Sequence, residues 1–546
     1  MIPGYQQFYA DFEPAQIAGM LSSDPRNGLN ACFECCDRHV DSGRTALCWE
    51  GENGESAKFS FADLKDHSAR LAAFFQQQGI QPGDRIACLL PRVPELFITA
   101  LAAWRLGAVY VPLFTAFGPR AIQFRLDQSD SKLVVTDTSQ RHKLDGVAHC
   151  PPVLTVVQQG ESVADGDFDF HAERIAQAPV FEPVMRGMDD PFMLLFTSGT
   201  TGAPKGVGIP LKAILPFIVY MKYGIGLKPG DNYWNAADPG WAYGLFYVVV
   251  GPLLLGHTTH FYAGMFTADS TYRMLKKYRI NSLAAAPTAY RLLMGASENP
   301  DDYDLCLDTA VSCGEPLNPE AIRWVNDKLH CPVYDQYGQT EIGMVVCNHH
   351  GLKHAVTAGS MGWPMPGYRM VAVNDQGREA GPGETGQLAM DLGASPLNYF
   401  QDYWNRDGGD HYLDKYYLTG DTVEHCPDGN FVFVGRGDDI IASAGYRIGP
   451  FDVESALIEH PAVAESGVVG KPDPDRGEIV VAYVVTAPGF DATPELAAEL
   501  QRYVHQALSA HAYPREVHFI ESLPKTASGK IQRYILKNTA AGENEK

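Results

Sequence analysis

The sequence lacks a surplus of positive charge. Its 546 residues include 43 lysines and arginines against 65 aspartates and glutamates, which gives a formal net charge of -22. Proteins that hold nucleic acids neutralise phosphates with clustered lysine and arginine, so this balance argues against a nucleic-acid partner. Small anionic ligands are still compatible with an acidic chain, because a few local cations and backbone N–H groups suffice to bind them.

Long hydrophobic runs are also missing. The longest uncharged apolar stretch, 241–256, is short for a bilayer span and is interrupted by Gly244, Gly251 and Pro252. Residues Met1–Tyr5 contain no basic region followed by an apolar run, as a secretory signal would. We therefore expect a cytoplasmic enzyme without a membrane span.

No arrangement of cysteines suggests a disulfide framework. The eleven cysteines are odd in number and scattered along a large acidic chain, which indicates reduced thiols. Cys32 and Cys35 form a lone C-x-x-C pair, and no second pair follows at the spacing of a zinc site. A metal or redox role for these thiols is therefore the weaker interpretation.

What the sequence does contain is an alternation of helical and strand-like segments. Four successive segments have the apolar spacing of a helix, a strand, a helix and a strand, with glycine or proline between them: 61–78, 85–90, 94–106 and 108–111. The same alternation of strands and helices recurs as far as Tyr334. Strands that alternate with helices form parallel sheets covered on both faces, so we predict an α/β fold.

The pattern changes after about Gly351. Antiparallel strands are expected at 368–373 and 386–390, and a further strand at 431–434. A polar stretch with two glycines, 435–439, then precedes a mixture of short strands and helices. We therefore predict two domains, which are residues 1–435 and 436–546.

The most specific segment runs from Phe196 to Gly206 and directly follows an apolar strand, 192–195. Its sequence is FTSGTTGAPKG. Hydroxyls, glycines and a lysine together form a loop with many donors for phosphate oxygens. The segment differs from a Walker loop, which needs a Gly-Lys pair, because the order here is Lys205–Gly206. We predict a phosphate-binding loop, and a plain surface turn is the weaker alternative.

Four further segments carry polar side chains suited to nucleotide chemistry. They are Tyr334–Glu341, Tyr417–Asp421 with 435–439 behind it, Gly445–Gly449 and Pro524–Ile531. Thr340 and Glu341 could offer a hydroxyl and a carboxylate to Mg²⁺ bound to ATP. A carboxylate such as Asp421 can bridge two ribose hydroxyls, and an arginine such as Arg436 can pair with phosphate.

Five motifs in this order resemble the adenylate-forming superfamily, which includes acyl-CoA synthetases, firefly luciferase and the adenylation domains of peptide synthetases. The resemblance covers roughly residues 58–537, and the chain looks most like short- and medium-chain acyl-CoA synthetases. It implies a large N-terminal domain of parallel-sheet αβ subdomains plus a small β-barrel, with a small mobile α+β C-terminal domain. It also implies an AMP-forming acyl-CoA synthetase that uses ATP, Mg²⁺ and coenzyme A.

The resemblance implies a role for each matching residue. The phosphate loop would comprise Thr197, Ser198, Gly199, Thr200, Thr201, Gly202 and Lys205. The adenine would lie against Gly314, Glu315, Pro316, Asp335, Gln336 and Tyr337. Thr340 would contact the α-phosphate, Glu341 the magnesium ion, Asp421 the ribose, and Arg436 the ribose and phosphate. Catalytic Lys530 would bridge the acid and the α-phosphate, Asp438 would be the hinge, and the pantetheine channel would be faced by Gly445, Tyr446 and Arg447.

The implied chemistry suits these residue types. A carboxylate is a poor acyl donor, whereas an acyl-adenylate has AMP as its leaving group and reacts with a thiol. Because ATP and the acid are both anions, catalysis consists mostly of alignment and cationic clamping by Lys530 and Mg²⁺. Lys530 and the pantetheine channel cannot both be ideally placed at once, so we expect the C-terminal domain to swing about Asp438.

The acid is expected to be larger than acetate. In acetate-specific relatives the position that matches Gly338 carries a tryptophan, which closes the acyl pocket, and glycine here would leave that space open. Trp241, Ala242, Tyr243 and Cys313 would line the same pocket and limit its depth, which favours short, medium-chain or branched acids. The alternative interpretation of Gly338 is that it permits a tight backbone turn.

Two other functions fit part of this pattern. A stand-alone adenylation enzyme would load a carrier protein instead of free coenzyme A, and a catalytically inactive relative would only bind nucleotide. Intact Lys530, Glu341, Asp421 and Arg436 argue against the inactive relative. The identity of the acid and the oligomeric state do not follow from these motifs.

Overall fold

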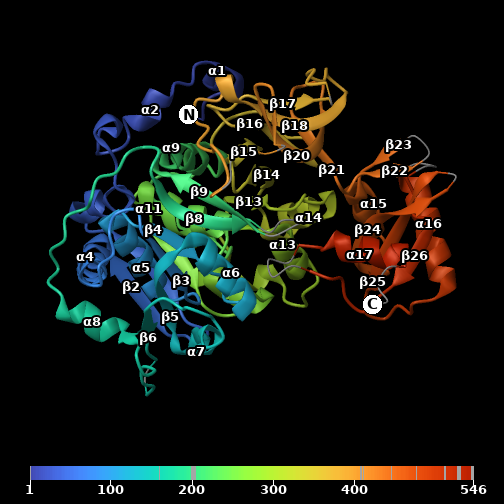
Figure 1. The fold of residues 1–546 in the computed structure, drawn as a ribbon. Helices are drawn as coiled ribbons and strands as arrows, with labels where there is room; N and C mark the ends of the chain where they lie inside the picture. The colour runs from blue at the N-terminus through green and yellow to red at the C-terminus, as the bar shows by residue number, and fades with distance from the viewer. Residues whose placement is uncertain are drawn as a thin grey trace.

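The computed structural model describes residues 2–158, 160–197, 204–374, 376–405, 409, 411–443, 446–474, 476–508, 512–525 and 530–542, with the backbone alone at 446 and 447. The predicted α/β fold is confirmed: Figure 1 shows a large N-terminal part and a smaller C-terminal unit beside it. Within those ranges, no helix has both the length and the apolar character needed to cross a bilayer.

Three sheets are present in the described part, and the first has the strand order β7-β6-β5-β3-β4-β8-β9. Its strands are β3 (Arg85–Leu89), β4 (Val109–Pro112), β5 (Ser131–Asp137), β6 (Val153–Val156), β7 (Phe168–Asp169), β8 (Pro191–Thr197) and β9 (Lys205–Pro210). The pairs β3–β4 and β3–β5 are parallel. Helix α5 (Pro94–Leu106) crosses from β3 to β4; it begins with proline, which suits the first helical turn, and ends at Gly107 with a φ of 77°.

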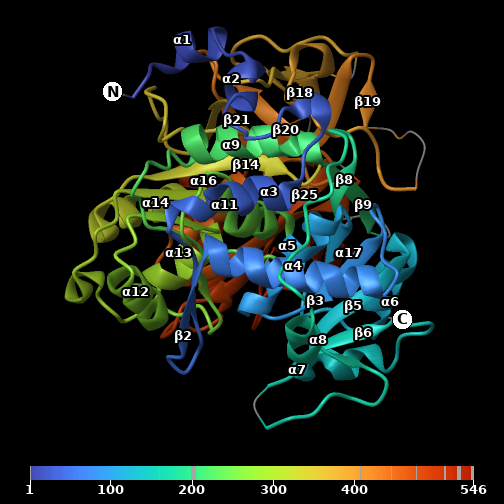
Figure 2. The ribbon, with the colours of Figure 1, turned by 90° about the vertical axis from the view of Figure 1, so that its left-hand side faces the viewer.

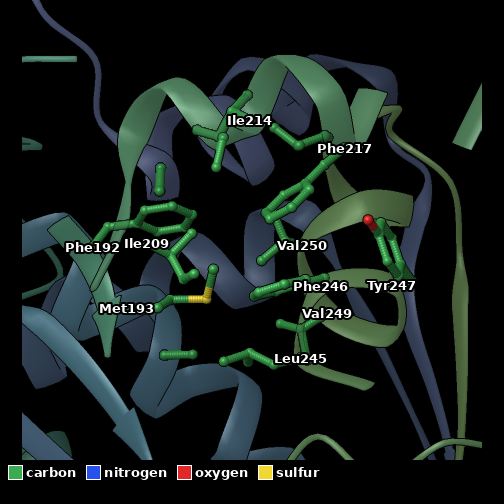
Figure 3. Packing of buried hydrophobic residues seen from close by; sticks show 14 of the residues in the cluster. Phe192, Met193, Ile209, Ile214, Phe217, Leu245, Phe246, Tyr247, Val249 and Val250 are labelled. Carbon is green, nitrogen blue, oxygen red and sulfur yellow. The ribbon is translucent and has the colours of Figure 1, made fainter. Parts of the chain in front are cut away.

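The hairpin β8–β9 flanks the predicted phosphate loop and places Thr197 opposite Lys205. Its buried face is anchored in the core, where Phe192, Met193 and Ile209 pack against α9 (Ile214–Val219) and the π-helical segment η6 (Leu245–Val250), as Figure 3 shows. Burial of a large apolar side chain contributes about 1.5–3 kcal/mol. The two ends of the predicted loop are therefore held by rigid strands.

The second sheet is larger and has a parallel half. The strands of that half are β1 (Thr45–Glu50), β10 (Tyr233–Asn235), β11 (Thr259–Tyr262), β12 (Ser282–Ala285), β13 (Thr309–Cys313) and β14 (Val333–Gln339), and β2 (Ser56–Ser60) pairs antiparallel with β1. Because parallel strands point the same way, the residues after β13 and β14 meet at one edge. These residues are Gly314 and Thr340, both predicted to bind ATP.

Antiparallel strands extend the same sheet beyond β14. They are β15 (Gly343–Cys347), β16 (Ser360–Pro364), β17 (Met370–Val373), β18 (Thr385–Asp391), β19 (Tyr412–Leu413), β20 (Tyr416–His425) and β21 (Phe431–Arg436). Their hydrogen-bonded order is β17-β18-β20-β21-β16-β15, so the strands expected in a small barrel continue directly from the parallel half. This continuity brings β20 and β21 toward the edge formed by β13 and β14.

Helices pack between the first two sheets. They include α3 (Ala31–Cys35), α4 (Phe61–Gln77), α5, α9 and α11 (Gly251–Leu254), and their buried side chains form one cluster with residues of both sheets. Cys32 and Cys35 of the lone C-x-x-C pair belong to this core as free thiols. Helix α6 (Pro119–Ser129) covers the other face of the first sheet, and α12 (Ala268–Lys277), α13 (Pro287–Met294) and α14 (Pro319–Trp324) cover that of the second. Figure 2 shows these outer helices on opposite sides of the molecule.

The third sheet belongs to the C-terminal unit. Its elements are β22 (Ile441–Ser443), β23 (Tyr446–Ile448), β24 (Val463–Asp473), β25 (Gly477–Thr486) and β26 (Glu516–Phe519), with helices α15 (Pro450–Ile458), α16 (Pro494–Ala507) and α17 (Arg533–Ala541). Strand β21 ends at Arg436 and β22 begins at Ile441, so the connection between the second and third sheets is 437–440. The predicted division at 435/436 falls before the last residue of β21, just ahead of this connection.

Candidate active site

A cavity of about 1840 Å³ lies where the edge of the second sheet meets the C-terminal unit. The predicted nucleotide and catalytic residues that line it are Thr197, Lys205, Gly314, Glu315, Pro316, Asp335, Gln336, Tyr337, Thr340, Glu341, Asp421, Arg436 and Lys530, and the predicted hinge residue Asp438 lines it as well. The remaining loop residues Ser198, Gly199, Thr200, Thr201 and Gly202 lie outside the described residues. The fold therefore gathers side chains from distant motifs around one space.

At one part of the cavity a carboxylate is held by two neutral donors. Asp421 on β20 lies opposite Arg436 on β21, and its Oδ2 accepts hydrogen bonds from the Tyr337 hydroxyl and, at 2.9 Å, from Gln339 Nε2. Among the described residues, no donor contacts Oδ1. Burial raises the pKa of Asp421, while Arg436 and the two donors oppose that rise. The carboxylate is thus fixed in orientation with one oxygen left to accept from a ligand.

Two neighbouring side chains on β14 have different environments. Asp335 is buried and accepts hydrogen bonds from the backbone N–H groups of Leu317 (3.2 Å) and Gln336 (3.0 Å), and burial raises its pKa to about 7. The side chain of Gln336 is engaged within the protein: Nε2 donates to the main-chain oxygens of Gly224 and Asn348 at 3.0 and 3.1 Å. Gln336 therefore fixes β14 in place, and its side-chain amide is directed to the protein interior.

A third acidic side chain lies near the end of the predicted phosphate loop. Glu341 is buried, and its Oε1 accepts a 2.9 Å hydrogen bond from the Tyr403 hydroxyl. Lys205 Nζ lies 4.6 Å from the centre of the Tyr403 ring, a cation–π contact. Burial raises the pKa of Glu341, and Tyr403, Lys205 and Arg436 counteract that rise. In the described part of the chain, no three His, Cys, Asp or Glu side chains cluster in an arrangement for a metal ion.

Tyr403 and Gln339 were not predicted from the sequence. Tyr403 comes from a loop after β18 and reaches Glu341 across 62 residues of chain. Gln339 reaches Asp421 across 82 residues. No local sequence pattern identifies Tyr403 as a partner of Glu341. For Gln339, the one signal was its position as a polar residue within the motif Tyr334–Glu341.

All five residues predicted for the acyl pocket line the same cavity: Trp241, Ala242, Tyr243, Cys313 and Gly338. Trp241 packs against Phe114 and Phe117, with ring centres 5.1 and 5.6 Å away. The Tyr243 and Tyr220 hydroxyls are hydrogen-bonded at 2.8 Å. Ala242 and Tyr243 lie just before the π-helical η6, an element that is frequent at functional sites.

The expectation that Gly338 leaves open space is wrong at the position of its missing side chain. An added Cβ would lie 2.3 Å from the main-chain oxygen of Gly343 and 2.8 Å from Cα of Met344. Strand β15 pairs with β14 here and places Met344 opposite Gly338. Backbone atoms therefore fill this space, and glycine is required for the close approach of the two strands.

The C-terminal unit contributes Lys530 to the cavity. Its positive charge lowers the pKa of both Cys313 and Asp421, although burial outweighs this effect at each group. Of the residues predicted to face the pantetheine channel, Gly445 lies outside the described residues. Tyr446 and Arg447 belong to β23, where their backbones pair with Ser443 and Ala442 of β22. Their role toward a thiol substrate stays a prediction.

Comparison with known proteins gives consistent matches along the chain. The family model for AMP-binding enzymes matches residues 35–404, and that for the AMP-binding enzyme C-terminal domain matches residues 452–530. Acetyl-coenzyme A synthetase of Bacillus subtilis is 37% identical over 99% of this chain and 96% of its own. The mitochondrial acyl-coenzyme A synthetase ACSM4 of Rattus norvegicus is 35% identical over 91% and 87%. The crystal structure of a Brucella canis acyl-CoA synthetase is 50% identical, covers 100% of both chains and has a TM-score of 0.81.

Proposed function

The chain belongs to the family of AMP-binding enzymes, and on this premise we propose that it is an AMP-forming acyl-CoA synthetase. It activates a carboxylic acid with ATP, which yields an acyl-adenylate and pyrophosphate, and then transfers the acyl group to coenzyme A with release of AMP. The observation that carries this proposal is that Lys530 of the C-terminal unit lines the same cavity as Asp421, Asp335 and Thr340. One space thus contains a cation and the polar groups suited to a nucleotide.

In the first half-reaction an oxygen of the acid attacks the α-phosphorus of ATP, and the bond to pyrophosphate breaks. Both reactants are anionic, so Lys530 would hold them together by contacting the carboxylate and the α-phosphate. Asp421 would bind ribose through Oδ1, because Tyr337 and Gln339 already occupy Oδ2. Thr340 would contact the α-phosphate from the turn that ends β14.

Mg²⁺ fits the residues around Glu341. This ion commonly takes one or two protein carboxylates, together with substrate phosphates and water, in place of a cage of protein ligands. Glu341 is one such carboxylate, oriented by the Tyr403 hydroxyl and adjacent to Lys205. When bound, the ion would neutralise phosphate charge. Glu341 would hold it, and Lys205 would contact the outer phosphates.

In the second half-reaction the thiol of coenzyme A attacks the acyl carbon and AMP leaves. We propose that Asp438 is the hinge that turns the C-terminal unit, which removes Lys530 and brings Gly445, Tyr446 and Arg447 to the channel. Relatives whose names specify coenzyme A match nearly the whole chain, which favours free coenzyme A over a carrier protein. We also propose a cytoplasmic location, on the basis of the match to the Bacillus subtilis enzyme.

The acid is proposed to be apolar and larger than acetate. This rests on the apolar side chains that line the cavity, among them Phe114, Trp241, Phe246 and Met344, rather than on Gly338. Each buried methylene contributes about 0.8 kcal/mol, so such a lining favours longer or branched acids. Acetate is the main alternative for the acid, because the Bacillus subtilis relative is named as an acetyl-coenzyme A synthetase.

The test is a product analysis with ATP, coenzyme A and a panel of acetate, butyrate, hexanoate and benzoate. We expect AMP, pyrophosphate and acyl-CoA in equal amounts, and acid-dependent ATP–pyrophosphate exchange without coenzyme A. Exchange without any acyl-CoA would support carrier loading instead. ADP and inorganic phosphate as products would contradict the proposal, and a preference for acetate would contradict the proposed size of the acid.

A further inference from the structure

Arg125 is a buried cation with no acidic partner. It lies on α6 and is 5% exposed. One guanidinium nitrogen, Nη1, donates to the main-chain oxygen of Ala121 at 2.8 Å, and the guanidinium carbon lies 3.9 Å from the centre of the Phe117 ring. Throughout the described ranges, no aspartate or glutamate oxygen comes within 4 Å of its nitrogens. Buried arginines are usually paired with an anion, so this one is an exception that calls for an explanation.

The location of Arg125 indicates which kind of anion it would bind. Arg125 lines the large cavity, and its guanidinium lies 5.9 Å from the centre of the Phe196 ring. Phe196 immediately precedes Thr197, where β8 ends, and Thr197 pairs with Lys205 across the hairpin. Burial lowers the pKa of Arg125 to about 10, which leaves it charged at neutral pH. A buried cation therefore lies near the strand end that leads into the predicted phosphate loop.

We propose that Arg125 binds a phosphate group of a substrate in this cavity. The inference rests on the proposed function, which brings two phosphate-bearing substrates to this space. ATP is the favoured source of this phosphate. The reason is that Arg125 lies near Phe196, which directly precedes the loop predicted to bind the outer phosphates of ATP. Arginine suits the task because its planar fork presents several donors, and Nε and Nη2 have no protein acceptor among the described residues. The bound phosphate would then be the missing counter-charge.

The test measures Michaelis constants in acid-dependent ATP–pyrophosphate exchange for Arg125→Gln and Arg125→Lys. Loss of a charge-assisted contact should raise KM for ATP and for pyrophosphate roughly tenfold in Arg125→Gln, with KM for the acid unchanged. Arg125→Lys should recover part of the loss. Arg120→Gln, an exposed residue of the same helix that loses the same charge, is the matched control and should behave as wild type.

A second assay separates the two phosphate sources. With supplied acyl-adenylate, a raised KM for coenzyme A and an unchanged KM for ATP would assign the phosphate to coenzyme A. Unchanged constants for both substrates in a folded Arg125→Gln protein would overturn the proposal. If that variant does not fold, pyrophosphate alone should raise the Tm of wild type and Arg120→Gln more than that of Arg125→Lys, and equal shifts would overturn it. A wild type without any exchange would instead refute the proposed function.

Discussion

Lys537 donates a hydrogen bond to the main-chain oxygen of Asp438, so the last helix holds the segment that connects the second and third sheets. Lys537 Nζ also lies 3.4 Å from Asp439 Oδ1. Four residues earlier on α17, Arg533 lies 2.8 Å from Glu454 and 3.9 Å from Asp439. Lys530 lies shortly before this helix, which begins at Arg533, so the position of Lys530 in the cavity is coupled to the conformation of the connection.

The hinge prediction follows from this link. Proline fixes φ and removes an N–H donor, so Asp438→Pro should hold the connection in one conformation. We expect one half-reaction to lose far more rate than the other. Adenylate formation, measured by pyrophosphate exchange, and thioester formation from supplied acyl-adenylate would be compared with Asp438→Ala as the control. Equal effects on both half-reactions would show that Asp438 is not the hinge.

Removal of one hydroxyl tests the phosphate end of the cavity. Tyr403→Phe keeps the ring beneath Lys205 but deletes the donor to Glu341. Burial already raises the pKa of Glu341, and loss of the Tyr403 hydrogen bond should raise it further and so destabilise the ionised carboxylate. Because the ionised carboxylate is the form that would bind magnesium, KM for magnesium-bound ATP should rise roughly tenfold. Tyr303→Phe deletes a similar contact to Asp269 outside the cavity and should leave KM unchanged. An unaltered KM in Tyr403→Phe would refute the proposed role of this pair.

Asp335 predicts a pH dependence of stability. Its pKa is raised to about 7 by burial, so the folded protein keeps a proton that the unfolded chain releases above about pH 4. The folded state therefore binds more protons, and the free energy of unfolding should fall as pH rises from about 4 to 7, by up to about 1.4 kcal/mol per pH unit. Asp335→Asn should remove this contribution.

Urea unfolding at several pH values between these limits measures the effect as the difference between wild type and Asp335→Asn. Asp41→Asn, at an exposed position, controls for the loss of one carboxyl group. Parallel stability curves for wild type and Asp335→Asn would mean that the pKa of Asp335 is not raised.

Lys530→Ala tests the division of labour between the half-reactions. Loss of the ammonium group should strongly slow adenylate formation, because no cation from Lys530 then offsets the repulsion between the carboxylate and the α-phosphate. Thioester formation from supplied acyl-adenylate should be unaffected. Rapid-quench measurements of each step would give the two rates. Equal losses in both steps would refute the role of Lys530.

Features with local causes could be predicted from the sequence. Helix α5 has the predicted bounds Pro94–Leu106, because proline at its start and Gly107 at its end act within one turn. The order of strands and helices followed from periodicity, and the motif residues of the cavity followed from a resemblance carried by short segments. In each case the determining residues lie close together in the sequence.

Features that depend on register or on distant contacts could not be predicted. The space beside Gly338 is filled by Gly343 and Met344, and that fact requires the pairing of β14 with β15. The hydrogen bond from Tyr403 to Glu341 depends on how two loops meet. A glycine or a tyrosine alone gives no sign of which neighbour the fold will bring to it.

The central claim is that an oxygen of the acid attacks the α-phosphorus of ATP, and isotope transfer tests it most directly. The enzyme would be given an acid labelled with ¹⁸O in both carboxylate oxygens, together with ATP and coenzyme A, and the products would be analysed by mass spectrometry. We predict one ¹⁸O atom in each AMP and the other in the acyl-CoA. Unlabelled AMP, with the label in inorganic phosphate or pyrophosphate, would contradict the account.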